Sequence, residues 1–119
     1  MARPHQKLKV WSRGMELVKV IYQLTGQFPD NEKYGLISQL RRAAVSVPTN
    51  IAEGAGRHTD KEFLNFLYIA SGSLSEIETL AIIANDLKYI SNKEYSTLDE
   101  RLQELTAMTN GLIKKLKSN

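Results

Sequence analysis

Apolar side chains recur at alternating steps of three and four residues along most of this chain, and this spacing restricts it to packed helices. The longest run consists of Phe63, Phe66, Ala70, Ser73, Ile77, Leu80, Ala84 and Leu87. In an α-helix such residues share one face, and a seven-residue repeat is typical of a seam packed against other helices. We therefore expect a long helix over residues 60–89, with Thr59 and Glu62 as a capping box at its start.

Three further segments carry the same helical spacing. Residues 8–27 contain the row Val10, Gly14, Leu17, Ile21, Leu24 and Phe28. Residues 36–56 contain Ile37, Leu40, Ala44, Val47 and Ile51, and residues 92–117, which begin with a second capping box, contain Tyr95, Leu98, Leu102, Leu105, Thr109, Leu112 and Leu116. No segment alternates with the period of two that is typical of strands. Four helices joined by short connections predict an all-α, up-down-up-down four-helix bundle.

Composition sets the class of protein. A chain of 119 residues with 42% hydrophobic and 24% charged residues is expected to form one globular domain, residues 1–119. No run approaches the ~20 apolar residues of a membrane span, and no apolar signal segment precedes Arg13 and Glu16, so we expect a cytoplasmic protein without a membrane partner. The absence of cysteine excludes disulfides and thiolate chemistry.

Pro48 falls inside the second predicted helix. An interior proline removes one backbone hydrogen bond and costs ~3 kcal/mol. The apolar row keeps its phase across Pro48, so we expect one helix kinked there and not two helices. Beyond it, Gly54 and Gly56 predict a helix end that uses glycine in the left-handed conformation.

A polar row runs beside the apolar row of residues 36–56. Its members are Gln39, Arg42, Ser46, Asn50, Glu53 and Arg57. At 100° per residue the two rows are centred roughly 130° apart, so the polar row flanks the core. Three interpretations stay open: solvated surface, a hydrogen-bonded network that fixes one register between helices, or the wall of a channel in an oligomer. The network requires partners on the third helix, where Ser73 and Glu76 lie at a matching height.

A family resemblance depends on the same part of the chain. Its residues are Phe28-Pro29, Glu32, Tyr34-Gly35-Leu36, Gln39, Arg42, Ala43-Ala44, Ser46-Val47-Pro48, Asn50 to Gly54, Arg57, Phe63, Phe66-Leu67, Ala70, Gly72-Ser73-Leu74 and Glu76. On these residues the chain resembles the bacterial four-helix-bundle family named after proteins encoded in 23S rRNA intervening sequences. That family is similar in fold to the accessory protein of diversity-generating retroelements. The resemblance implies a homopentameric ring of bundles and, for the retroelement member, a reverse transcriptase partner and nucleic-acid binding.

The sequence lacks the side-chain sets of common enzyme classes. His5 is expected in a flexible N-terminal tail, and no Glu-x-x-His pair is present for a two-metal bundle site. Glu53 and Glu76 are candidates for a carboxylate pair. An ion pair with Arg42 or Arg57, buried or half-buried, explains these carboxylates more simply. We therefore expect no catalytic residues, no metal site and no cofactor.

Charge divides unequally between the two ends of the predicted bundle. One end, called here the basic pole, collects Arg3, Lys7, Lys9, Arg13, Arg57, Lys61, Lys114, Lys115 and Lys117. Three acidic residues, Glu53, Asp60 and Glu62, oppose these nine cations. Parallel subunits in a ring would combine their basic poles into one positive face suited to phosphate backbones, with weak sequence specificity. The alternative is that these cations only confer solubility.

A second apolar row lies beside the core row of the first helix. It consists of Trp11, Met15, Val18 and Tyr22, and a single bundle leaves such a row uncovered. We expect it to contact another subunit or a partner. Two hypotheses follow: a non-catalytic homo-oligomer that binds RNA or single-stranded nucleic acid through its basic pole, or a structural adaptor that docks a protein such as a reverse transcriptase without binding nucleic acid.

Overall fold

The computed structural model describes residues 3–118, and every regular element in that range is helical. The four α-helices are α1 (Lys9–Thr25), α2 (Leu36–Ala55), α3 (Asp60–Asp86) and α4 (Asn92–Lys117). Two short 3-10 helices, η1 (Pro4–Lys7) and η2 (Asp30–Glu32), precede α1 and α2. The predicted all-α class and the four helices are confirmed. His5, expected in a flexible tail, lies in η1 with its ring 5.1 Å from that of Trp11.

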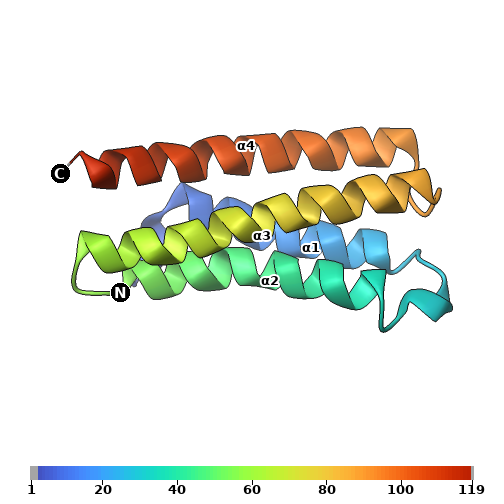
Figure 1. Cartoon of the computed structure of the whole chain (residues 1–119), viewed down its shortest axis with the longest axis horizontal. Helices are drawn as coiled ribbons and strands as arrows, with labels where there is room; N and C mark the ends of the chain where they lie inside the picture. Colours follow the sequence, from blue (N-terminus) through green and yellow to red (C-terminus); the bar gives the residue numbers. More distant parts are fainter. Residues whose placement is uncertain (1–2, 119) are drawn as a thin grey trace.

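The four helices lie side by side in an elongated body of 45 × 23 × 22 Å (Figure 1). α2 packs against α1 and α3, and α4 packs against α3 and closes on α1. Figure 1 shows the α2–α3 connection and both chain ends at one end of the long axis, and the other two connections at the opposite end. The segments that carry the basic pole therefore lie together in space.

The core is built from the predicted apolar rows. Buried members of these rows include Val10, Leu17, Ile21, Leu40, Ala44, Val47, Ile51, Ala70, Ile77, Leu80, Ala84, Leu98, Leu102 and Leu105. Leu87 departs from the prediction because α3 ends at Asp86 and not at residue 89. Lys88 adopts φ 63°, which turns the chain away and leaves the Leu87 side chain 51% exposed. α1 likewise ends at Thr25, two residues before the predicted boundary.

Side-chain caps begin the last two helices. The Ser91 hydroxyl accepts from the Glu94 N–H at 3.0 Å, and the Glu94 carboxylate accepts from the Ser91 N–H at 2.9 Å. This confirms the capping box at α4. At α3 the Thr59 hydroxyl accepts from the Glu62 N–H at 3.2 Å, but the Glu62 carboxylate accepts from the His58 N–H instead of that of Thr59. Only half of the predicted box therefore forms.

Pro48 lies within α2, which continues through it as one helix. The buried proline ring packs against α1 at Gly14, where an added Cβ would lie 3.4 Å from Pro48 Cβ. Pro48, which has no backbone N–H to donate, therefore lies where α1 and α2 are closely packed. The kink itself stays a prediction.

Glycine at the end of α2 serves close packing. Gly56 has φ −87°, in the right-handed region, so the predicted left-handed glycine is wrong. A Cβ on Gly54 would lie 2.7 Å from Phe63 Cδ1 and 2.8 Å from Phe66 Cβ. The absence of a side chain at Gly54 therefore lets the start of α3 approach α2.

Candidate nucleic-acid interface

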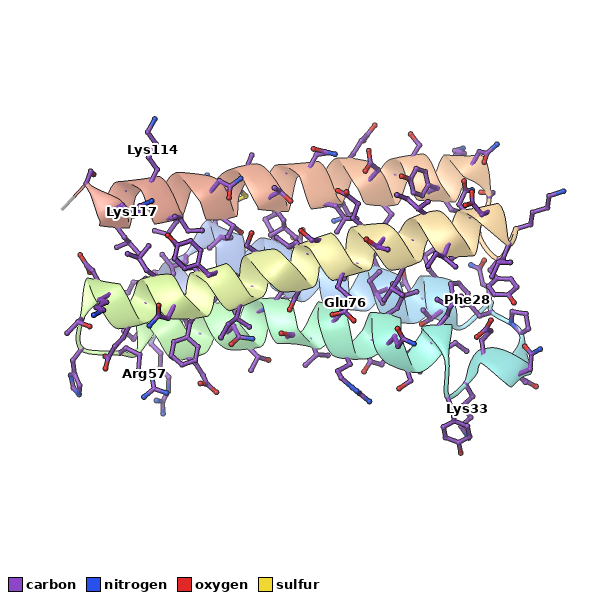
Figure 2. All side chains as sticks on the ribbon, viewed as in Figure 1. Phe28, Lys33, Arg57, Glu76, Lys114 and Lys117 are labelled. Carbon is purple, nitrogen blue, oxygen red and sulfur yellow. The ribbon has the colours of Figure 1, made fainter. Side chains whose placement is uncertain are left out.

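The structure brings most of the predicted basic pole together at one end of the molecule, but Arg13 lies nearer the middle, because it pairs with Glu104, midway along α4. Figure 2 shows Arg57, Lys114 and Lys117 at this end, and Phe28 and Lys33 at the opposite end. The remaining cations come from the region of η1 (Arg3, Lys7), the first turns of α1 (Lys9, Arg13), the start of α3 (Lys61) and the last turn of α4 (Lys115). The lysines of that last turn also complement the partial negative charge of a helix C-terminus.

Arg13 is the member of this set whose charge is most fully compensated. Its guanidinium lies 3.2 Å from the Glu16 carboxylate and 3.2 Å from that of Glu104 on α4. Arg101 extends the cluster, because its guanidinium lies 3.5 Å from Glu16. Arg13 therefore links α1 to α4 and offers less positive charge to a ligand than the sequence indicated.

Arg57 is partly engaged within the chain. Its Nη2 lies 3.6 Å from Glu53 Oε2, and its guanidinium lies 4.9 Å from the centre of the Phe66 ring. Both charged side chains are about half exposed, so the expected ion pair with Arg57 forms as a half-buried pair that is open to solvent. Solvent-accessible pairs of this kind contribute ~0–1 kcal/mol, which leaves the arginine available to exchange Glu53 for a phosphate.

The lysines of the basic pole form no ion pair within residues 3–118. They are Lys7, Lys9, Lys61, Lys114, Lys115 and Lys117, and all are exposed. Lys114 and Lys117 line a shallow depression together with Asn110, Ile113 and Ser118. This end of the molecule therefore carries uncompensated positive charge beside hydrogen-bonding side chains, which is a surface able to contact phosphate oxygens.

The polar row of α2 divides into a small network and an exposed part. The Ser46 and Ser73 hydroxyls lie 2.8 Å apart, and the Asn50 amide donates to the Ser46 carbonyl at 2.8 Å and to its hydroxyl at 2.9 Å. This part agrees with the hydrogen-bonded network. Glu76, expected as a second partner, is exposed, and its carboxylate makes no hydrogen bond within the described chain. Gln39, Arg42, Glu53 and Arg57 are exposed as well.

The second apolar row of α1 lines a groove between α1 and α2. Trp11, Met15 and Val18 form one wall, and Val45, Pro48, Thr49, Ala52 and Glu53 form the other, around about 480 Å³. We call this the α1/α2 groove. Tyr22, the fourth predicted contact residue, lies outside it. The guanidinium of Arg41 lies 4.4 Å from the centre of the Tyr22 ring, and Arg41 also donates to the Thr25 hydroxyl at 2.9 Å.

A second exposed apolar surface was not predicted from the sequence. It consists of Tyr68, Ile69, Ile82, Ile83 and Leu87, each 40–51% exposed, and we call it the α3 apolar face. Hydropathy is the signal that could have indicated it, because α3 is long and apolar enough to cross a membrane by length and composition. An 18-residue stretch of α3 has a mean hydropathy of 1.3, and only 33% of that stretch is buried. The helix nevertheless packs against α2 and α4. Much of its apolar surface therefore lies outside the core.

Glu32 and Tyr89 were also missed, at the end opposite the basic pole. The Glu32 carboxylate accepts from the Leu36 N–H at 3.2 Å and from the Tyr89 hydroxyl at 3.0 Å. The hydrogen bond to Glu32 raises the pKa of Tyr89 above 10.0, its ordinary value. The carboxylate thus joins the start of α2 to the α3–α4 connection. Within residues 3–118 no group of three or more His, Asp or Glu side chains is placed to hold a metal.

Comparison with known proteins agrees with this architecture. The protein family described as 23S rRNA-intervening sequence protein matches residues 6–111. A solved structure from Bacteroides thetaiotaomicron VPI-5482, described as a protein with unknown function from the S23 ribosomal protein family, is similar with a TM-score of 0.80. It shares 21% identity over 88% of this chain and 98% of its own, so the likeness concerns the fold alone. No curated protein matches the sequence.

Proposed function

The chain belongs to the 23S rRNA-intervening sequence protein family, and from this premise we propose that it is a non-catalytic, homo-oligomeric, cytoplasmic protein that binds RNA or single-stranded nucleic acid through its basic pole. The proposed subunit is an up-down-up-down bundle with α2 kinked at Pro48. The proposed assembly is a homopentameric ring, as the family resemblance implies. The observation that carries the function is the group of exposed lysines at one end of the bundle, which form no ion pair with any residue from 3 to 118.

The chemistry of this surface favours backbone contact over base recognition. Lysine ammonium groups are flexible point charges, which neutralise phosphates without selecting a base. Trp11 is partly buried and its ring meets that of His5, so this large aromatic side chain is not presented as a stacking platform. Parallel copies in a ring would place several basic poles on one face and multiply the number of phosphate contacts.

The proposal is tested by measuring the anisotropy of a labelled single-stranded RNA with two charge-matched variants. In one, Lys114 and Lys117 are both changed to Glu; in the other, Lys33 and Lys93 at the opposite end are changed in the same way. Both variants lower the net charge equally, so only the position of the change differs. We expect the first to weaken binding at least tenfold and the second to bind within about twofold of the wild type.

Salt provides a second readout on the same complex. Contacts to phosphates release counterions, so affinity should fall steeply as salt rises and be lost by about 0.5 M. Binding that persists at that concentration, or equal weakening by the two charge-matched variants, would contradict the phosphate-contact proposal.

A structural adaptor that docks a protein, such as a reverse transcriptase, is the second candidate. The exposed α1/α2 groove favours it, because apolar surfaces of this kind mark protein interaction sites. For an adaptor, changing Lys114 and Lys117 to Glu should leave docking intact, whereas Val45→Arg in the groove should abolish it. A protein that binds nucleic acid through its basic pole should instead lose RNA binding when Lys114 and Lys117 are changed to Glu and keep it in Val45→Arg.

A further inference from the structure

The α3 apolar face and the α1/α2 groove lie on different parts of the molecular surface, since α3 does not pack against α1. We propose that the Tyr68 and Ile69 end of the α3 apolar face of one copy occupies the α1/α2 groove of the next copy, with Glu76 of the first beside Arg42 of the second. This inference rests on the proposed self-association and adds the two surfaces that meet. Because the surfaces differ, the contact is head-to-tail, the kind that generates a ring when its rotation closes.

The two surfaces have matching chemistry. The groove is lined mainly by Trp11, Met15, Val18, Val45 and Pro48, so it requires an apolar occupant. The α3 apolar face offers Tyr68 and Ile69, about half exposed, one turn before Gly72. A Cβ on Gly72 would meet no atom within 4 Å, so nothing within residues 3–118 covers this part of the face.

The register of α2 and α3 places these surfaces at one height along the bundle. Ser46 lies against Ser73 in this antiparallel pair, so a residue of α2 and a residue of α3 share a height when their numbers sum to about 119. At 1.5 Å per residue, the α2 wall of the groove, residues 45–53, spans the heights of roughly residues 66–74 of α3. Tyr68 and Ile69 fall within that range. Copies can therefore meet without sliding along the long axis, which closes a ring and avoids a filament.

Charge supports the same pairing. Arg42 lies one turn before the groove residue Val45, and Glu76 lies one turn after Gly72 on α3. Both side chains are exposed and neither forms an ion pair within residues 3–118. By the same register Glu76 lies within about one residue of the height of Arg42. A neighbouring copy seated in the groove therefore brings a free carboxylate to a free guanidinium.

Glu76 also argues against the simplest alternative, in which two α3 helices pair with each other. It lies midway along the α3 apolar face, seven residues from both Ile69 and Ile83. A two-fold contact centred on this face would bring the two copies of Glu76 together, and like charges at short range oppose association. The groove of another copy avoids this repulsion. It also keeps all copies parallel, so every basic pole lies on the same side of the assembly.

Cysteine cross-linking tests the contact directly, because the natural chain contains no cysteine. Glu76→Cys and Arg42→Cys are prepared as separate chains, mixed, and treated with a short bismaleimide. We expect cross-linked dimers in the mixture and none in either variant alone. Glu78→Cys, exposed on the same helix two residues away, is the matched control and should give no product with Arg42→Cys. Cross-linking of Glu76→Cys to itself, or none in the mixture, would overturn the inference.

Charge reversal provides an independent test of the contact. The molar mass of each variant is measured by light scattering, and circular dichroism verifies its fold. Glu76→Arg and Arg42→Glu should each weaken assembly at least tenfold, while the chain with both changes should assemble like the wild type. Mixing the two single variants should restore association in large part, because unlike copies are complementary and alternation leaves only one contact between like copies in a ring of five. A pair within one chain would not be rescued by mixing. A wild type that assembles but is insensitive to both changes refutes this contact and leaves the proposed oligomer standing. A monomeric wild type refutes both.

Discussion

Gly54 of α2 faces the ring of Phe63 in α3, and a Cβ built on the glycine would lie 2.7 Å from Phe63 Cδ1. The same Cβ would lie 2.8 Å from Phe66 Cβ. Real Cβ atoms do not approach other carbons this closely, so any side chain at residue 54 pushes the two helices apart. Gly54 therefore sets the distance between α2 and α3 near the basic pole.

Replacing Gly54 by Ala should destabilise the fold even though alanine favours helices. Overpacking costs ~1–3 kcal/mol, and the higher helix propensity of alanine offsets only ~1 kcal/mol of that cost, so we expect a net loss of up to about 2 kcal/mol. Gly111→Ala is the matched control, because a Cβ there meets no atom within 4 Å. That variant should gain up to ~1 kcal/mol. Urea unfolding of both variants measures the difference, and equal effects would contradict the steric explanation.

The contact between Ser46 and Ser73 should give a measurable coupling energy. Removing either hydroxyl breaks the 2.8 Å hydrogen bond between α2 and α3, so each serine-to-alanine change should cost ~0.5–1.5 kcal/mol. A double-mutant cycle should return a coupling of similar size. The pair Asn50 and Glu76 is the control: Glu76 lies outside the network, so its cycle should be additive. A zero coupling for the serine pair would show that the hydrogen bond contributes nothing.

The protein should become more stable when Thr109 is replaced by valine. The threonine side chain is fully buried and its hydroxyl has no hydrogen-bond partner within residues 3–118. An unpaired buried hydroxyl costs ~1–3 kcal/mol, so Thr109→Val should stabilise the protein by about that amount. Thr25→Val should do the reverse, since the Thr25 hydroxyl donates to the Ile21 carbonyl at 2.7 Å and accepts from Arg41 at 2.9 Å. Thermal melts of the two variants should shift in opposite directions.

The cap of α4 should make stability depend on acid pH. The Ser91 N–H holds the pKa of Glu94 below its ordinary value of 4.5. Because the folded pKa is lower than the unfolded one, this contribution is present above pH 4.5 and is lost as the pH falls through the folded value. Glu94→Gln should therefore be less stable than the wild type near neutral pH, and the difference should shrink in acid. Chemical unfolding across that range measures it.

Ser91→Ala provides the control for this pH dependence. It removes the hydroxyl that accepts from the Glu94 N–H but keeps the backbone N–H that donates to the carboxylate. The variant should lose stability at every pH and keep most of the acid dependence. If both variants behave alike from neutral pH to acid, the carboxylate is not responsible.

The sequence predicted the helices well because burial repeats with the period of the helix. Leu17, Ala44, Ile77 and Leu102 lie in the core where the apolar rows placed them. The end of α3 was not predictable in the same way. It depends on Lys88, which adopts the left-handed conformation with φ 63°. Glycine favours that conformation, so a lysine in the sequence does not predict it.

The surface was less predictable because it depends on how helices are rotated against one another. Arg13 looks like a free cation in the sequence, and its pairing with Glu104 exists only because α1 and α4 meet there. The α3 apolar face was hidden for a related reason. In a helix rich in apolar residues, Ile69 and Ile83 resemble core side chains until the packing of α2 and α4 shows which sides of α3 are covered.

The separation between the α3 apolar face and the α1/α2 groove has a consequence for copy number. In a head-to-tail ring, the angle between the two contacting surfaces of a subunit, seen down the ring axis, equals the rotation from one copy to the next. The packing of α3 on α2 sets that angle, and Gly54 sets the spacing of this pair near the basic pole. A methyl group at residue 54 would then alter the curvature of the ring, and with it the diameter of the opening that the bundles enclose.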